Sequence, residues 1–331
     1  MAPRRGGLKT HGQSGAVVIA LLLAAGTAWT QELDFQKGIT KQQGGSHERS
    51  SSYSLGYLEA LGEHSAWSAT YLNEGHVPSH KRDGFAFQLW GREQLIARRL
   101  SLAAGVGPYL YFDTHFTASP TGTSYADEHG VGAIASVAVT FYASGRLFFQ
   151  ARGNWIATGR TSEIVTATVG LGFRLEPSRT LEPPTEAGGE STRATSNEVT
   201  VLAGLATLNS VEHGDAFSQD IEYRRALTRS LDWTIGWLDE GTLIARAGPM
   251  AQLWAVRAFF ADRLALGIGF GPYLARDRHG EDSTTRLDCL VSLTGRVRLM
   301  PRWALRGTFH RVATSDSGDS DVFLIGVSYL F

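Results

Sequence analysis

Apolar and polar residues alternate along most of the chain with a period of two. Between Arg99 and Asp113, the apolar positions run from Leu100 to Phe112 in steps of two, and the intervening positions are mostly small or polar. Between Arg302 and Arg311 one face carries Trp303, Leu305 and Phe309, and the other carries Arg306, Thr308 and His310. Successive side chains of a strand point to opposite faces. The pattern therefore predicts an all-β fold of antiparallel strands.

The lengths of the connections predict a barrel that spans a membrane. About eight alternating segments fit between residues 30 and 175, and about eight more fit between 198 and 331. Short connections alternate with longer polar ones, an arrangement typical of transmembrane barrels. The short ones include Gly62–Ser65, Ala143–Gly145 and Ala261–Arg263, and the long ones include Gly75–Asp83, Thr114–Glu128, Asp239–Gly248 and Asp277–Thr284. Aromatic residues near segment ends predict interfacial girdles on the apolar faces: Trp67, Tyr71, Trp233, Trp237, Phe309 and Tyr329.

The first 28 residues have the three parts of a secretory signal peptide. Arg4, Arg5 and Lys9 precede an apolar core at 15–25, and small residues follow around Ala28. We expect cleavage there, so that the mature chain begins near residue 29. The chain has no later apolar run of about 18 residues, so we expect no spanning helix. A soluble secreted protein and a transmembrane barrel remain.

The end of the chain favours the barrel. Val327, Tyr329 and Phe331 alternate with Ser328 and Leu330, and the strand stops at an aromatic residue. This ending resembles the C-terminal signature of bacterial outer-membrane β-barrel proteins, although no particular family is identified. The resemblance implies location in a Gram-negative outer membrane, with outer-membrane lipid and lipopolysaccharide as partners.

The chain contains an internal duplication. Residues 57–75 match 223–241, and residues 88–113 match 252–277 at an offset of 164 (252 minus 88). Identical pairs include Trp67/Trp233, Glu74/Glu240, Gln88/Gln252, Trp90/Trp254, Tyr109/Tyr273 and Asp113/Asp277. A segment at 176–197, rich in Pro, Glu, Ser and Thr, separates the copies and reads as a solvated linker on the side of the short turns.

Two architectures follow from this duplication. In one, residues 29–175 and 198–331 each close as an eight-stranded barrel. In the other, sixteen strands form a single wide barrel. The linker and a terminal-like strand at 169–173 favour two barrels. The distinction matters because side chains fill a small barrel, whereas sixteen strands leave an aqueous channel.

The inward faces carry most of the candidate functional residues. Acids, amides, phenols and guanidinium groups recur at matching positions, and they form either a network that fills the lumen or a site that contacts a small solute. The predicted inward residues are Glu74, Gln88, Trp90, Arg92, Tyr109, Asp113, Arg152 and Asn154 in the first copy, and Glu240, Gln252, Trp254, Tyr273, Asp277, Arg306, Thr308 and His310 in the second.

Composition removes several other classes of function. The net charge is −1, from 31 basic and 32 acidic residues, so nucleic-acid binding is not expected. A single cysteine, Cys289, excludes an intramolecular disulfide and a cysteine-based zinc site. We expect no cofactor and no metal. The acidic stretch at 314–321 lacks the terminal Glu of a calcium loop and reads as a solvated loop.

An enzymatic alternative rests on histidines at the outer rim. His76 and His80 lie beside Glu74, and a His, Ser and acid set there would be similar to outer-membrane enzymes that act on lipid A. In the lipid A deacylase family, a His-x-Ser pair precedes the final strand. Here the stretch reads His310-Arg311-Val312, without the serine, so we expect a non-enzymatic envelope protein with a structural or small-solute role.

Overall fold

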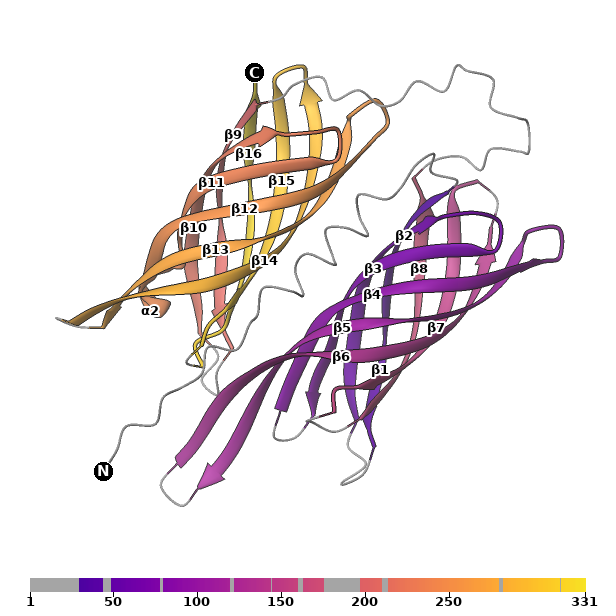
Figure 1. The fold of residues 1–331 in the computed structure, drawn as a ribbon, viewed down its shortest axis with the longest axis horizontal. Helices are drawn as coiled ribbons and strands as arrows, with labels where there is room; N and C mark the ends of the chain where they lie inside the picture. Colours follow the sequence, from indigo (N-terminus) through magenta and orange to yellow (C-terminus); the bar gives the residue numbers. More distant parts are fainter. Residues whose placement is uncertain are drawn as a thin grey trace.

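The computed structural model contains two closed antiparallel barrels of eight strands each (Figure 1). It describes residues 30–43, 49–77, 80–119, 122–143, 145–159, 163–175, 197–209, 214–279, 282–315 and 317–331. The signal segment at 1–28 and all but the last residue of the linker at 176–197 lie outside these ranges. No helix among the described residues is long and apolar enough to cross a membrane.

Barrel 1 consists of the first eight strands, and each strand pairs with the next. Their bounds are β1 Gln31–Gln42, β2 Arg49–Ala60, β3 Ser65–Val77, β4 His80–Leu95, β5 Leu100–Ser119, β6 Gly122–Tyr142, β7 Leu147–Ala157 and β8 Ile164–Arg174. Strand β1 pairs with β8 from Glu32↔Arg174 to Gln42↔Ile164, which closes the cylinder.

Barrel 2 repeats this order and adds one helical turn. Its strands are β9 Asn197–Leu208, β10 Asp215–Ala226, β11 Leu231–Asp239, β12 Arg246–Phe259, β13 Leu264–His279, β14 Asp282–Met300, β15 Trp303–Ala313 and β16 Ser320–Leu330, with helix α2 at Gly241–Ile244. Strand β16 pairs with β9. Each half therefore closes on itself, and the alternative of one sixteen-stranded barrel is wrong.

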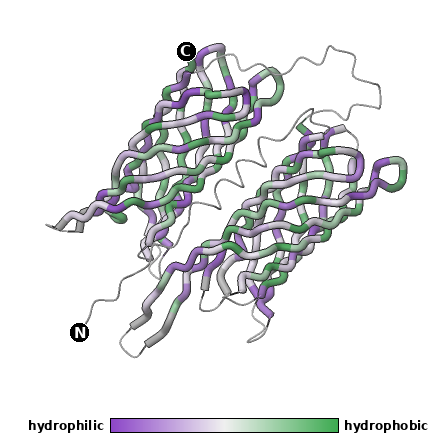
Figure 2. The backbone as a smooth tube through the Cα atoms, in the orientation of Figure 1, coloured by the Kyte–Doolittle hydropathy of each residue, from purple (hydrophilic) through white to green (hydrophobic). Residues whose placement is uncertain are grey.

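The alternation of side chains matches the predicted period of two. On β5, Val106 is 64% exposed on the outer surface, whereas Tyr109 is fully buried in the lumen. Figure 2 shows hydrophobic and hydrophilic residues alternating along the strands of both barrels. The apolar positions form the outer surfaces, and polar side chains occupy the interiors.

Most of the predicted long loops are extensions of the strands. The stretch 114–128 belongs to β5 and β6, which pair as far as Ser119↔Gly122. Figure 1 shows this hairpin projecting beyond the rest of barrel 1. The stretches 75–83 and 277–284 are likewise largely strand. Polar composition suggested loops there, but alternate polar residues pair equally well in a ladder that continues into water. We call this side the hairpin end and the other side the turn end.

The two barrels contact each other through their outer faces. An aromatic contact joins Tyr71, Phe85, Phe87 and Phe112 of barrel 1 to Val291 and Phe309 of barrel 2. The rings of Tyr71 and Phe309 lie 5.3 Å apart. Trp67, Tyr71 and Phe309 are therefore less than a tenth exposed. The prediction that these three form a girdle facing lipid is wrong, because barrel–barrel packing and lipid contact both select apolar aromatic side chains.

Ion pairs border the aromatic contact at both ends. At the hairpin end, Arg311 of barrel 2 donates to Asp83 of barrel 1 and, at 2.7 Å, to Asp321 of its own barrel. At the turn end, Arg257 of barrel 2 lies 3.4 Å from the Glu59 carboxylate of barrel 1. These side chains occupy outward positions beside apolar residues, where an unpaired charge is costly. Their pairing across the contact lowers that cost.

Candidate functional site in the barrel interiors

A charged cluster occupies the lumen of barrel 1 near the hairpin end. Arg82 donates to Oε2 of Glu74 from Nε at 2.9 Å and from a terminal nitrogen at 2.8 Å. The Tyr109 hydroxyl donates to Oε1 of the same carboxylate at 2.7 Å. Asp113 lies 4.0 Å from Arg82. All four side chains are buried, so each charge needs this partner set, and the cluster obstructs the lumen at this level.

A second layer crosses the middle of barrel 1. The Gln88 amide donates to Ser136 at 2.9 Å, Ser136 donates to Asn154 at 2.7 Å, and Asn154 donates to Thr166 at 2.7 Å. Trp90 donates from its indole nitrogen to Ser68 at 2.8 Å. Strands β3, β4, β6, β7 and β8 are joined through the interior by these bonds, as expected when buried polar groups must be satisfied.

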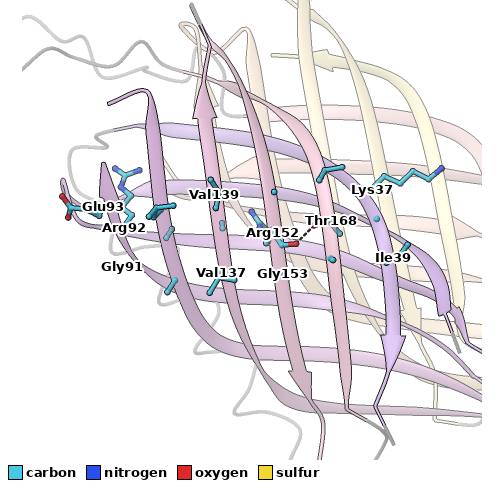
Figure 3. Close-up of a pocket in the computed structure, with 18 of the residues that line it drawn as sticks. Lys37, Ile39, Gly91, Arg92, Glu93, Val137, Val139, Arg152, Gly153 and Thr168 are labelled. Atoms are coloured by element: carbon cyan, nitrogen blue, oxygen red, sulfur yellow. Dashed lines mark hydrogen bonds between the residues drawn. The ribbon is translucent and has the colours of Figure 1, made fainter. Parts of the chain in front are cut away.

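Below this layer, barrel 1 contains a cavity of about 1170 Å³. It is bordered by inward residues of six strands, namely Gly38, Arg92, Ala103, Ala138, Arg152 and Thr168. Four of these six are small, which leaves the space unfilled. The cavity extends to His64 in the turn at 61–64, so it reaches the turn end. Figure 3 shows Arg92, Arg152 and Thr168 among the residues that border the cavity, with Lys37 extending away from the barrel wall.

The two arginines are held in place but keep free donors. Arg152 donates to Gln150 at 2.7 Å and to the buried Asp34 carboxylate at 3.4 Å, and its guanidinium lies 5.4 Å from the Trp90 ring. Arg92 donates to the Gly62 carbonyl at 3.1 Å. Within the described structure, the Nε atoms of Arg92 and Arg152 are buried and make no hydrogen bond. Such donors suit the oxygens of a carboxylate or phosphate.

Barrel 2 repeats the upper two layers. Arg246 donates to both Glu240 oxygens, at 2.5 and 2.6 Å, so the Glu–Arg pair of barrel 1 recurs. Tyr273, the counterpart of Tyr109, likewise interacts with the Glu240 carboxylate, and its hydroxyl lies 3.2 Å from the Leu238 carbonyl. Other equivalents are Gln252 donating to Ser292 at 2.7 Å, Trp254 donating to Thr234 at 3.0 Å, and Asp277 accepting from Arg286.

The lower lumen of barrel 2 is filled where barrel 1 is hollow. Arg306 donates to Glu198 and, at 3.1 Å, to Glu222, and the Arg224 guanidinium lies 4.1 Å from the Trp254 ring. Arg296 also donates to Glu198, at 3.3 Å. A space of only about 10 Å³ lies beside Arg224, Arg296 and Arg306.

The strand register identifies the residues that replace the polar border of the cavity. Arg92 pairs with Ala103, and Val256 pairs with Gly267 at the same place. Arg152 lies between Ala138 and Thr168, and the matching row in barrel 2 is Thr294, Thr308 and Leu324. Arg92, Arg152 and Thr168 are thus replaced by Val256, Thr308 and Leu324. The two copies differ at the three polar residues of the cavity.

A serine, a histidine and an aspartate meet inside barrel 2. Ser292 Oγ lies 2.7 Å from Nδ1 of His310, and Nε2 of His310 lies 3.5 Å from Asp220. These residue types form a catalytic triad in many hydrolases. Here all three are buried within the filled lumen. A lipid acyl group outside the barrel does not reach Ser292, so the geometry is that of an internal polar link.

The structure places the remaining candidates as follows. The residues predicted to face the lumen are buried there, from Glu74 to Arg306, and whether they serve a solute stays a prediction. The side chains of His76 and His80 lie outside the described part of the chain. Glu74 points into the lumen and is engaged by Arg82 and Tyr109, so it is not an orienting acid for a histidine at the outer rim.

Several residues of these clusters were missed by the sequence reasoning. Arg82 and Arg246 differ by the same 164 residues (246 minus 82) as the matched segments 88–113 and 252–277, so extending that match upstream would have found them. Glu198, Glu222 and Arg224 have no such signal. They lie outside the matched segments or have no identical counterpart, and only the closure of β9 onto β16 brings Glu198 to Arg306.

Comparison with known proteins describes fold class alone. No known family model matches the sequence, and none of the curated proteins compared does so. The N-terminal β-barrel domain of Pseudomonas aeruginosa OprF is 12% identical, with 44% of this chain and 98% of that chain covered and a TM-score of 0.34. Neisserial surface protein A is 8% identical, with 43% of this chain and 96% of that chain covered and a TM-score of 0.37. The CymD monoaromatic hydrocarbon channel is 8% identical, with 91% of this chain and 88% of that chain covered and a TM-score of 0.24. The functional proposal therefore rests on the residues of this chain.

Proposed function

We propose that this chain is a non-enzymatic outer-membrane protein of a Gram-negative envelope. Its two barrels stand side by side in the bilayer, and the interior of barrel 1 holds a small anionic solute. The observation that carries the proposal is the cavity of about 1170 Å³ in barrel 1, bordered by Arg92, Arg152 and Thr168, at a level where barrel 2 is filled. No cofactor is needed for this role.

Membrane placement is supported by the outer surfaces. Large apolar side chains project outward along the strands of both barrels, for example Phe35, Val169, Phe217 and Leu287, each more than half exposed. Monomeric soluble proteins rarely expose contiguous apolar surface on this scale. The alternation along the strands and the pattern of residues 1–28 agree with export to the outer membrane, where lipid and lipopolysaccharide would surround the barrels.

The filled interiors argue against a diffusion pore. An eight-stranded barrel is just wide enough for its side chains to fill. Glu74 with Arg82, and Glu240 with Arg246, occupy the two lumens at the hairpin end. We expect the detergent-refolded mature chain, from residue 29 on, to give no stable conductance in planar bilayers. Reproducible conductance steps of porin size, recorded from protein that shows heat-modifiable gel mobility, would show that at least one lumen is open to diffusion.

The chemistry of the cavity points to an anion with two or more oxygens. Guanidinium groups bind carboxylates and phosphates through paired hydrogen bonds, and Arg92 and Arg152 keep unused Nε donors. The Thr168 hydroxyl donates to Gln36 at 2.6 Å, so the guanidinium groups are the donors that face an anion. Because the cavity reaches the turn end, we expect the solute to enter from the periplasm.

Calorimetric titration of the refolded chain with inorganic phosphate and with succinate tests this site. We expect saturable binding to one site, lost when Arg92→Val, Arg152→Thr and Thr168→Leu are combined to copy barrel 2. Ala138→Phe fills the cavity without changing a charge and should also abolish binding. Its control is Val131→Phe, since Val131 is 52% exposed on the outer surface of the same strand and does not line the cavity. Equal binding by both phenylalanine variants would exclude the cavity as the site.

A further inference from the structure

The contact between the barrels is not packed along its whole length. The aromatic contact closes its hairpin-end half, and the pair Glu59–Arg257 lies at its turn end. Between them lies a groove with a volume of about 130 Å³. Its walls are outward side chains of both barrels, including Leu55, Trp67 and Ala69 on one side and Ala255, Leu266 and Ile268 on the other.

The groove is suited to hydrocarbon. Apart from Arg257, with Ser230 at the mouth, its outward walls are aliphatic and aromatic. Its volume is close to that of the engineered apolar cavity of about 150 Å³ that stays free of water and binds benzene. A space of this size and lining accepts a segment of an acyl chain, because the chain replaces lost van der Waals contacts that water cannot supply.

The turn end of the groove adds a recognition element for a headgroup. Arg257 lies 3.4 Å from the Ser230 hydroxyl as well as from Glu59. Arg229 is exposed in the same turn as Ser230. Arg146 of barrel 1 lies 5.2 Å from the ring of Phe260, and the adjacent Phe259 contacts Tyr57 in the groove wall. Arg257 is thus the guanidinium group at the mouth, and Glu59 is the acid that opposes it.

We propose that the groove between the barrels binds one phospholipid of the inner leaflet, with an acyl chain between Ala69 and Ala255 and the phosphate at Arg257 and Ser230. This inference rests on the proposed membrane placement, but not on the solute site in barrel 1. The occupant is a lipid and not free phosphate, because the apolar walls contribute only to binding of a chain. The lipid then completes the packing between the two barrels.

Native mass spectrometry of the refolded mature chain tests the proposal, with dioleoyl phosphatidylglycerol as the added lipid. We expect one tightly retained lipid that excess inorganic phosphate does not displace. Ala255→Trp fills the groove and should weaken retention at least about tenfold, which corresponds to about 1.4 kcal/mol. Ala251→Trp is the matched control, because Ala251 is an exposed outward residue on the same strand outside the groove.

The headgroup contact has its own variants. Glu59→Gln removes the opposing charge and should strengthen retention of phosphatidylglycerol. The double variant Glu59→Gln with Arg257→Gln removes both charges without leaving one buried alone, and should abolish the preference for phosphatidylglycerol over phosphatidylcholine. Heat-modifiable mobility shows that each variant is folded.

Two results would overturn the lipid site. One is equal lipid retention by Ala255→Trp and Ala251→Trp. The other is displacement of the lipid by inorganic phosphate, which would indicate an ion site without a chain. Neither result affects the conductance or calorimetric tests of the proposed function, so failure of the lipid site and failure of that function are distinguishable.

Discussion

Barrel 1 and barrel 2 share their upper interiors and differ in their lower ones. Both place a Glu–Arg pair near the hairpin end and a Gln–Ser link with a Trp indole below it. Below that level, barrel 1 has two arginines beside a cavity, and barrel 2 has a close-packed ladder of Arg306, Glu198 and Glu222. The shared part is what an eight-stranded barrel needs in order to close, and the divergent part is free to take on a function.

The difference also shows two ways of accommodating arginine inside a barrel. In barrel 2, each guanidinium is surrounded by carboxylates, and removing one partner leaves an uncompensated buried charge. In barrel 1, Arg152 has one carboxylate partner, Asp34 at 3.4 Å, besides Gln150 and Trp90, and it borders a space that water can enter. Solvent lowers the cost of an unpaired charge. The two arginines should therefore respond very differently to removal.

Arg306→Met should give the largest effect. It leaves Glu198 and Glu222 without this partner in a dry lumen, and breaking a buried ion pair costs about 3–5 kcal/mol. Arg152→Met should cost less, because it breaks a single long ion pair, with Asp34 at 3.4 Å, beside a cavity that water can enter. Urea unfolding followed by tryptophan fluorescence and gel mobility measures both. Equal losses would mean that the cavity gives Arg152 no access to water.

Val256→Arg should have the next largest effect, because it places the Arg92 side chain of barrel 1 into the filled barrel. With only about 10 Å³ of space nearby, the added atoms overpack the lumen. Overpacking costs about 1–3 kcal/mol before the added charge is counted. The reverse change, Arg92→Val, removes volume from a lumen that is already hollow and should be tolerated. A smaller urea midpoint shift for Val256→Arg than for Arg92→Val would contradict the filled lumen of barrel 2.

The joint between the barrels should respond to acid. Nε2 of His129 in barrel 1 lies 2.6 Å from the Asp319 carboxylate in the segment before β16 of barrel 2. Burial raises the pKa of Asp319, but the hydrogen bond and charge of His129, with Arg311, outweigh burial and hold this pKa below its usual range. A lowered carboxyl pKa stabilises the folded state above the unfolded value of about 3.9, and that contribution is lost as the pH falls through the lower folded value.

Stability measured against pH checks this sign. The unfolding free energy of the wild type should exceed that of Asp319→Asn at pH 7, and this difference should disappear below about pH 4. Asp215→Asn, at an exposed carboxylate of barrel 2, is the control and should show a smaller gap. A difference in unfolding free energy that grows toward low pH would contradict a lowered pKa of Asp319.

The smallest expected effect concerns a turn that both barrels share. Ile96, Ala97 and Arg98 have positive φ angles of 50°, 51° and 65°, and Phe260, Ala261 and Asp262 repeat them at 53°, 54° and 63°. A left-handed conformation costs a non-glycine residue about 1–2 kcal/mol. Ala97→Gly and Ala261→Gly should each raise the unfolding free energy by up to about 1 kcal/mol, since glycine adopts this region freely. Ala143→Gly, in a turn residue without positive φ, should give no gain.

The sequence predicted the fold because lumen and exterior make opposite demands on alternate residues. The period of two, the duplication and the terminal-like strand at 169–173 led to two eight-stranded barrels, and the strand pairing agrees. The contact between the barrels was not predicted, since Tyr71 and Phe309 satisfy a lipid girdle equally well. The signal that was available is Asp83 and Arg311, charges at outward positions that would be costly in lipid.

The cavity could not be predicted from the sequence for a different reason. Arg152 was correctly placed among the inward residues, but an empty volume depends on where neighbouring side chains go, and no single position encodes it. What the sequence does contain is the substitution of Arg92 by Val256 at the offset of the matched segments. Comparison of the two copies at inward positions would have directed attention to this level of barrel 1.

The self-contained closure of each half has a consequence for biogenesis. The pairing of β1 with β8 and of β9 with β16 means that each barrel is sealed by contacts within its own half. Joining the ends of a chain twice as long would cost only about 0.6 kcal/mol more, so loop entropy does not decide between one closure and two. Closure within each half keeps the pairing more local, and folding is faster when pairing is more local. Two short assembly cycles followed by lateral docking let the second copy fold beside a finished first copy, and a gene duplication could succeed at once without inventing a wider barrel.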